Sequence, residues 1–319
     1  MNEIIRHIQK RIPAWQGRKF NVDVLAGGIT NKNYKVTVDQ EAYAVRVCAP
    51  NVGIHGINRR VEYQCAKAAA QIGIAPEVIA FLEDLPSSNE VLITRFIDAQ
   101  PLTPLDSHDP VRLNQIVSIL QRYHSLTDFA GRFDVFRIFE NCLVFAFSKQ
   151  APLPPSIDQV QLAMQRIERA LQQLALPLAP CHNDLLPSNF LLDKNQQLWL
   201  IDWEYAGWGD PFFDLGNLAV NHEFDNAQDE ALLTAYFGHI TTLNLAHLKL
   251  MKIVSDAREG IWSFVQWSIS TLEFDYAAYG NYHLERFMTN YASAEVTNWL
   301  AVVENAGSAG LANPIQPPP

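Results

Sequence analysis

Three oxygen-bearing side chains surround a short apolar run in residues 181–205, CHNDLLPSNFLLDKNQQLWLIDWEY. Asp184 and Asn189 are five positions apart, and Asp202 directly follows the apolar run LWLI. If FLLD and LWLI pair as a hairpin, the three side chains converge at one point. Because unpaired carboxylates are costly among apolar residues, we expect partners of opposite charge close by.

This set of residues suits phosphoryl transfer from ATP. The reaction needs a carboxylate that orients the attacking hydroxyl or accepts its proton, and oxygen ligands for Mg²⁺. Asp184 suits the first task, whereas Asn189 and Asp202 suit the second. A bound dication would offset the negative charge of the cluster. The alternative, that each Asp only caps a helix or closes a turn, is preferred for Asp193 and Asp210.

Two segments here, HNDLLPSN and LIDWEYAGWGDPFFDLGN, resemble the catalytic and metal-binding segments of the choline/ethanolamine kinase family, within the aminoglycoside-phosphotransferase-like kinases. The resemblance extends over about residues 27–287 and is also tight near GIWSFVQWSISTLEFDYAAY. It implies a bilobal, protein-kinase-like fold of the α+β class. By this resemblance Asp184 is the catalytic base, and Asn189 and Asp202 bind magnesium. His182 and Asp214 would support the catalytic loop.

Nucleotide binding is expected from the first hundred residues. The turn AGGITNKN could direct backbone N–H groups at a triphosphate, although alone such a turn is also a common hairpin connection. The resemblance places four loop residues there: Gly27, Gly28, Thr30 and Asn31. It also implies that adenine meets the main chain of the segment leaving the last strand, at Arg95, Phe96 and Ile97.

A basic residue on the third expected strand is the candidate phosphate contact. In AYAVRV, strand alternation puts Arg46 on the face opposite its two valine neighbours. An exposed sheet arginine is the plain alternative. The resemblance implies that Arg46 contacts the phosphates and that Glu62 of the following helix holds it. Arg59 and Arg60 are interpreted as a solvated helix face.

The acceptor pocket is expected beside Asp184. In AREGIWSFVQWSISTLEF, Glu259, Trp262 and Gln266 form one stripe at helical spacing. Ordinary packing is the alternative, but this face suits an organic cation, which an aromatic ring attracts by roughly 0.5 to 2 kcal/mol. By the resemblance, Trp262 and Tyr279 match aromatic positions of a choline pocket. Where relatives closer to the animal choline kinases carry another aromatic residue, this chain has Glu259, which could hold a quaternary ammonium by charge or favour a primary ammonium such as ethanolamine.

Three functions therefore remain open from the sequence. The first is an ATP-dependent kinase for the hydroxyl of choline or a related amino alcohol, and the second is a thiamine or aminoglycoside kinase of the same fold. An aminoglycoside enzyme needs several carboxylates for its polycation, and the C-terminal NPIQPPP contains none. The third is a catalytically silent kinase-like protein, which would normally lack the base or a metal ligand.

The surrounding elements divide the chain into two expected lobes. A nucleotide-binding lobe, residues 1–97, contains one helix over 58–73 and strands over 20–25, 34–38, 42–47, 77–83 and 90–97. An amphipathic helix at the start, with Ile4, Ile5, Ile8 and Ile12 at helical spacing, is expected to dock on the protein's own fold, and an organelle presequence is the alternative. A mainly helical catalytic and acceptor-binding lobe, residues 98–304, follows a Pro- and Asp-rich hinge. Residues 305–319 are expected to be a disordered tail.

Composition limits the partners. The chain of 319 residues has a net charge of -10 and no run of Lys or Arg, which argues against nucleic acid and anionic membranes. Four widely spaced cysteines with no CxxC pair, and no membrane-spanning or signal-like apolar run, favour the cytoplasm. The expected partners are ATP and a small cationic alcohol, with Mg²⁺ as cofactor; the sequence does not indicate an oligomeric state.

Overall fold

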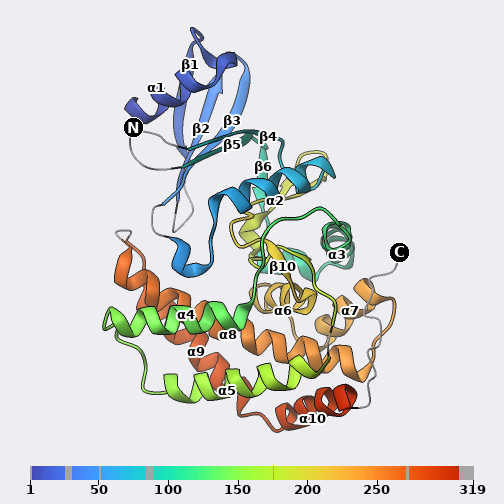
Figure 1. The fold of residues 1–319 in the computed structure, drawn as a ribbon. Coiled ribbons are helices and arrows are strands. Elements are labelled where there is room, and N and C mark those ends of the chain that lie inside the picture. The colour runs from blue at the N-terminus through green and yellow to red at the C-terminus, as the bar shows by residue number, and fades with distance from the viewer. Residues whose placement is uncertain are drawn as a thin grey trace.

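A small lobe built around a sheet and a larger helical lobe make up the chain (Figure 1). The structure is a computed structural model and describes residues 2–25, 31–49, 52–83, 90–174, 176–270 and 273–308. The expected α+β class with two lobes is confirmed. None of the helices in these ranges combines the length and the apolar character that crossing a membrane requires.

The small lobe contains one antiparallel sheet in the order β1-β2-β3-β5-β4. Its strands are β1 (Phe20–Leu25), β2 (Lys32–Val38), β3 (Glu41–Val47), β4 (Val78–Leu82) and β5 (Val91–Arg95). The predicted N-terminal helix is α1 (Asn2–Arg11), followed by the short helix η1 (Pro13–Trp15). Ile5, Ile8 and Ile12 are buried in one cluster with Val36 and Val45 of the sheet, so the predicted docking of this segment is confirmed.

Helix α2 (Arg59–Gln71) lies between the sheet and the larger lobe (Figure 1). Helix α2 follows the short helix η2 (Val52–His55). Asn58 caps the N-terminus of α2 by accepting hydrogen bonds from two backbone N–H groups. Its buried face, which includes Cys65 and Ala69, belongs to the core of the large lobe. The position of α2 is therefore coupled to the large lobe.

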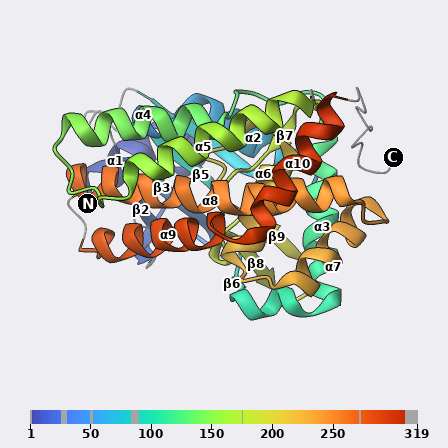
Figure 2. The same ribbon diagram turned by 90° about the horizontal axis from the view of Figure 1, so that it is seen from below.

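The large lobe is organised around one long buried helix, α8 (Thr242–Ile269), which contacts α4, α6, α9 and α10 (Figure 2). Its other helices are η3 (Pro104–His108), α3 (Pro110–His124), α4 (Val135–Ser148), α5 (Ile157–Leu171), η4 (Gln172–Leu174), η5 (Pro187–Asn189), α6 (Pro211–Asn221), α7 (Asn226–Phe237), α9 (Tyr276–Tyr291) and α10 (Ala294–Ser308). Helix α4 has apolar residues on its solvent side as well as in the core, since Val144 and Phe147 are exposed.

Short strands hold the loops of the large lobe in place. The predicted hairpin is present as β8 (Phe190–Asp193) and β9 (Leu198–Leu200), and β6 (Ala99–Pro101), in the expected hinge, pairs with β8. Strand β7 (Ala179–Cys181) pairs with β10 (Gly207–Gly209). At Gly207 a Cβ would lie 3.0 Å from backbone atoms of Arg132, so this close approach of two backbones requires glycine.

The expected tail begins later than residue 305. Helix α10 continues to Ser308, because Gly307 packs directly against η4: a Cβ there would lie 2.5 Å from the Cβ of Gln173. The prediction that residues 305–308 are disordered is therefore wrong. The rest of the predicted tail, residues 309–319, lies outside the described residues.

Candidate active site

A buried carboxylate on α6 holds the loop that carries Asp184. The Oδ1 and Oδ2 atoms of Asp214 accept hydrogen bonds from the backbone N–H groups of Asn183 (2.6 Å) and His182 (2.9 Å). Tyr123 and His124 of α3 also contact Oδ2, at 2.6 and 3.0 Å. Burial alone would raise the pKa of Asp214, but these hydrogen bonds and the His124 ring bring it below its ordinary value. The loop is thus tied to the core through backbone groups.

Two further side chains support the same loop. The Nε2 atom of His182 lies 2.9 Å from the carbonyl oxygen of Ile201, next to Asp202, and the ring meets Trp203 edge-on. Asn217, which our sequence analysis did not single out, accepts a hydrogen bond of 2.6 Å from the Leu185 N–H. Its amide donates to Ser255 of α8 at 3.0 Å. The only sequence signal for Asn217 is its position one helical turn after Asp214.

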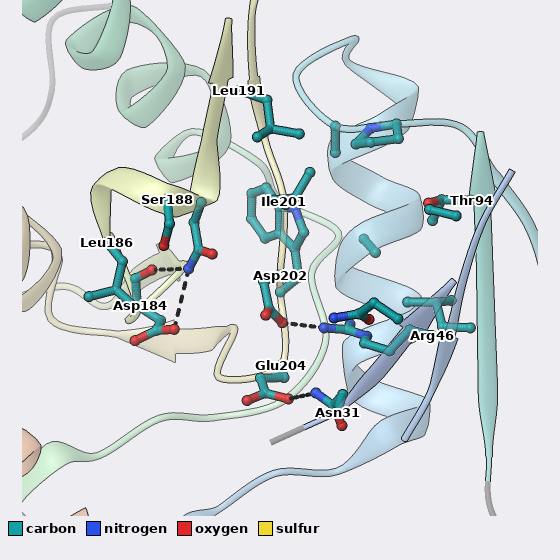
Figure 3. A pocket seen from close by; sticks show the side chains of 18 of the residues that line it. Asn31, Arg46, Thr94, Asp184, Leu186, Ser188, Leu191, Ile201, Asp202 and Glu204 are labelled. Atoms are coloured by element: carbon teal, nitrogen blue, oxygen red, sulfur yellow. Dashed lines mark hydrogen bonds and ion pairs between the residues drawn. The ribbon is translucent and has the colours of Figure 1, made fainter. Parts of the chain in front are cut away.

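Asp184, Asn189 and Asp202 all line a cleft between the lobes, in which Figure 3 shows Asp184 and Asp202. The helix η5 (Pro187–Asn189) places Asn189 so that its Nδ2 donates to the Asp184 carbonyl oxygen at 2.8 Å and lies 3.3 Å from Oδ2. Asp202 follows β9 with a φ of +67°, in the left-handed region that residues other than glycine rarely adopt. This turn at the strand end aims its carboxylate into the cleft.

Burial raises the pKa of the Asp184 carboxyl group well above its ordinary value. Arg258 of α8 opposes the shift, since its Nη1 lies 3.3 Å from Oδ1. The nearby carboxylates of Glu259, Asp202 and Glu204 raise the pKa further. A cation bound beside Asp202 would stabilise the ionised form of Asp184.

On the opposite wall, Arg46 forms ion pairs with Glu62 of α2 and with Asp202. Burial would raise the pKa of Asp202, but the Arg46 guanidinium holds it below its ordinary value. The expected pairing of Arg46 with Glu62 is therefore present, and the same guanidinium reaches the expected metal ligand.

The interpretation of Arg59 as part of a solvated helix face is wrong. Its side chain is buried and contacts Glu62 at 2.7 Å, Glu204 at 2.8 Å and Asn31 at 3.0 Å. Arg60, in contrast, is exposed and pairs with Glu83 at 2.8 Å. The sequence did not reveal this difference, because most of the partners of Arg59 come from distant parts of the chain.

The cleft is also lined by the end of β5 and the residues that follow it, Arg95, Phe96 and Ile97, as expected for a segment that binds the nucleotide. The N–H of Arg95 donates to the Glu77 carbonyl at 2.8 Å, and that of Phe96 to the Ala42 carbonyl at 3.0 Å. These two amides are used by the sheet, so any main-chain contact with adenine would come from the remaining groups. Of the expected loop residues, Asn31 is buried in the cleft wall, whereas Gly27, Gly28 and Thr30 lie outside the described residues.

The expected acceptor residues line the same cleft, beside Asp184. The hydroxyl of Tyr279 donates to Glu259 Oε2 at 3.1 Å, and the rings of Trp262 and Tyr279 meet edge-on with centroids 6.1 Å apart. Arg258, which our sequence analysis missed, pairs with Glu259 Oε1 at 2.5 Å, and its guanidinium lies 4.2 Å from the Tyr205 ring centroid. The cleft has a volume of about 650 Å³.

Comparison with known proteins identifies the family. Residues 21–246 match the family APH, described as the phosphotransferase enzyme family. The chain belongs to this family. It is 28% identical over 247 residues to Protein LicA of Haemophilus influenzae, covering 74% of this chain and 70% of that protein. It is 26% identical over 295 residues to the probable ethanolamine kinase of Arabidopsis thaliana, covering 82% and 76%.

The structural comparison agrees with this assignment. A choline/ethanolamine kinase family protein from Mesorhizobium loti superposes with a TM-score of 0.77 at 28% identity, covering 95% of this chain and 99% of the other. The predicted resemblance to choline/ethanolamine kinases and the kinase-like fold are thereby confirmed. This member of the phosphotransferase enzyme family is therefore an enzyme, and the third candidate function, a silent binding protein, is set aside.

Proposed function

We propose that the protein is a magnesium-dependent kinase that transfers the γ-phosphate of ATP to the hydroxyl of choline or ethanolamine. One observation carries the proposal: the cluster Asp184, Asn189 and Asp202 shares its cleft with the acid and rings of Glu259, Trp262 and Tyr279. The first group suits phosphoryl transfer and the second suits an organic cation, so one small molecule could contact both.

The oxygen donors of the first group fit magnesium. The Nδ2 of Asn189 is occupied by hydrogen bonds to Asp184, which leaves its carbonyl oxygen for a ligand. Asp202 is about a third exposed toward the cleft and uses one carboxylate oxygen for Arg46. Mg²⁺ prefers an octahedron of oxygens and usually keeps several waters, so two protein ligands and phosphate oxygens suffice. When bound, the ion would neutralise charge on the phosphates.

Phosphoryl transfer then needs positioning more than covalent chemistry. Asp184 is placed to accept a hydrogen bond from the acceptor hydroxyl and to take its proton as the new O–P bond forms, while the bond from the γ-phosphorus to the bridging oxygen breaks and ADP leaves with the electron pair. The loop that carries Asp184 is held through backbone amides by Asp214 and Asn217, so this carboxylate has little freedom to move. Arg46, released from Asp202 by a cation, would be free to contact a phosphate.

The two acceptor carboxylates lie close together. Oδ1 of Asp184 and Oε1 of Glu259 both contact Arg258 Nη1, at 3.3 and 2.5 Å, so they cannot lie farther apart than these two distances together. This spacing supports an acceptor whose hydroxyl and cationic nitrogen are joined by a short carbon chain, as in choline and ethanolamine.

The cationic end has two sources of attraction. Glu259 is buried, and burial alone would raise its pKa. The Arg258 guanidinium holds the pKa below its ordinary value, so Glu259 carries a negative charge. Trp262 and Tyr279 present ring surfaces beside it. A quaternary ammonium would use the rings and the charge, whereas a primary ammonium could also donate hydrogen bonds to the carboxylate.

An acceptor panel tests the proposal. Purified protein is incubated with ATP, Mg²⁺ and choline, ethanolamine, thiamine, homoserine or an aminoglycoside, and ADP release is measured against a control without acceptor. We expect release with choline or ethanolamine. Absence of acceptor-dependent ADP release across the panel would remove the proposal, and release only with thiamine or an aminoglycoside would replace its acceptor.

A further inference from the structure

A buried guanidinium lies where three parts of the cleft wall meet. Arg59 is the first residue of α2, and its side chain is 3% exposed. Nη1 donates to Glu62 Oε2 at 2.7 Å and to Glu204 Oε2 at 2.8 Å. Nη2 donates to Asn31 Oδ1 at 3.0 Å. A single side chain thus contacts two carboxylates and an amide.

A second set of contacts closes this arrangement into a ring. The Nδ2 of Asn31 donates to Glu204 Oε2 at 3.0 Å, a contact drawn in Figure 3. Its Oδ1, besides receiving Arg59, accepts the backbone N–H of Ala49 at 3.0 Å. Asn31, Arg59 and Glu204 therefore fix one another, and each of them is buried.

Each partner of Arg59 belongs to a different functional part. Asn31 is the one residue of the expected phosphate loop set that the structure describes, and it directly precedes β2. Glu62 holds Arg46, and Glu204 stands two residues after Asp202. Arg59 consequently connects the loop end, helix α2 and the segment that carries the expected metal ligand.

Charge explains why these parts depend on this one side chain. In this group two guanidinium groups, Arg46 and Arg59, face three carboxylates, Glu62, Asp202 and Glu204. Removing a cation from such a site leaves buried carboxylates without compensation, which favours their separation or hydration. Helix α2 and the strand end at Asp202 would then lose their fixed relative position.

We propose that Arg59 is a positioning residue for phosphoryl transfer, which joins the two lobes so that Arg46 and Asp202 face the same nucleotide. Arg59 acts through Glu204, Glu62 and Asn31 and contacts neither substrate. The proposal goes beyond the acceptor assignment, because it concerns the nucleotide and metal side of the cleft. It holds whichever alcohol the enzyme phosphorylates.

The test compares Arg59→Met with Arg60→Met, which removes an exposed arginine from the next position of the same helix. Binding of a fluorescent ATP analogue is titrated with and without Mg²⁺, so the readout does not depend on knowing the acceptor. We expect Arg59→Met to weaken binding in the presence of Mg²⁺ at least about tenfold and to abolish most of the gain that Mg²⁺ brings. Arg60→Met should bind like the wild type.

Steady-state kinetics with an acceptor found in the panel separates positioning from general damage. Arg59→Met should lower kcat and raise the KM for ATP, while the KM for the acceptor changes by less than about threefold. Arg59→Lys keeps the charge and should recover part of the loss. Equal changes in both KM values, or an unchanged Mg²⁺ effect on nucleotide binding in a folded variant, would overturn the proposal.

A second variant serves if Arg59→Met does not fold. Glu204→Gln keeps an oxygen for Asn31 but removes the charge that Arg59 meets. We expect a smaller loss of the same kind, confined to Mg²⁺-dependent nucleotide binding. Glu204→Gln is tested alongside Arg59→Lys. If Glu204→Gln folds and leaves Mg²⁺-dependent nucleotide binding unchanged, the proposal fails even though the acceptor assignment stands.

Discussion

Replacing Asp214 by asparagine tests whether a buried carboxylate holds the catalytic loop. In the wild type, Oδ1 accepts the Asn183 N–H and Oδ2 accepts the His182 N–H, with Tyr123 and His124 also directed at Oδ2. An amide retains a single acceptor oxygen. Whichever way it turns, its NH₂ group faces a backbone N–H that cannot rotate away.

The expected cost follows from counting these bonds. A buried donor left without an acceptor costs about 1–3 kcal/mol, and hydrogen bonds to a charged group are worth about 1.5–3 kcal/mol each. We therefore expect Asp214→Asn to lower the free energy of unfolding by about 3–5 kcal/mol, a large part of the 5–15 kcal/mol typical of a domain. Turnover should fall as well, because the loop with Asp184 loses its anchor.

Urea unfolding followed by fluorescence measures the loss, with Asp193→Asn as the matched control. Asp193 Oδ1 accepts the N–H groups of Asn195 and Gln197 in an exposed turn, and an asparagine oxygen can do the same. Among the described residues, the only bond lost is the 3.2 Å contact from the Trp199 indole N–H to Oδ2, which lies near the surface. The control should therefore change the free energy of unfolding by less than about 1 kcal/mol. If Asp214→Asn unfolds at the same urea concentration as this control, the idea of a carboxylate anchor is refuted.

Three further outcomes are expected. Asp184→Asn should lower kcat at least about a thousandfold while ATP still binds, because only the group that receives the hydroxyl proton is lost; loss of ATP binding measured by calorimetry would contradict this. Trp262→Ala should raise the KM for choline more than it lowers kcat, as initial rates against choline would show. His222 is buried, which lowers its pKa to about 3. As the pH falls from the ordinary histidine pKa toward 3, this side chain therefore binds a proton in the unfolded chain but not in the folded one. The contribution of this group to the free energy of unfolding should be fully present above about pH 6.5 and about 2 kcal/mol smaller at pH 5. Urea unfolding at both pH values should show that His222→Gln loses this pH dependence.

Local sequence patterns were sufficient for the elements near the chemistry. The hairpin of β8 and β9 and the five strands of the small lobe are described by alternation and turn residues that are close in the sequence. The interpretation of Asp193 and Asp210 also agrees with the structure, because Asp193 closes a turn and Asp210 caps α6. Each of these elements is indicated by residues close in the sequence, although the sheet itself also needs the pairing of β3 with β5, which come from separate parts of the chain.

The sequence by itself determined which residues could form the catalytic cluster, because the spacing of Asp184, Asn189 and Asp202 within one hairpin and its preceding loop brings them together. Only the tertiary structure decided that Arg59 is buried, since its partners Asn31 and Glu204 are 28 and 145 residues away. The same holds for Arg258, whose contact with Asp184 joins residues 74 positions apart. A charge on a helix has the same pattern whether it faces water or a distant carboxylate, and only tertiary packing, within a lobe for Arg258 and between the lobes for Arg59, makes that choice.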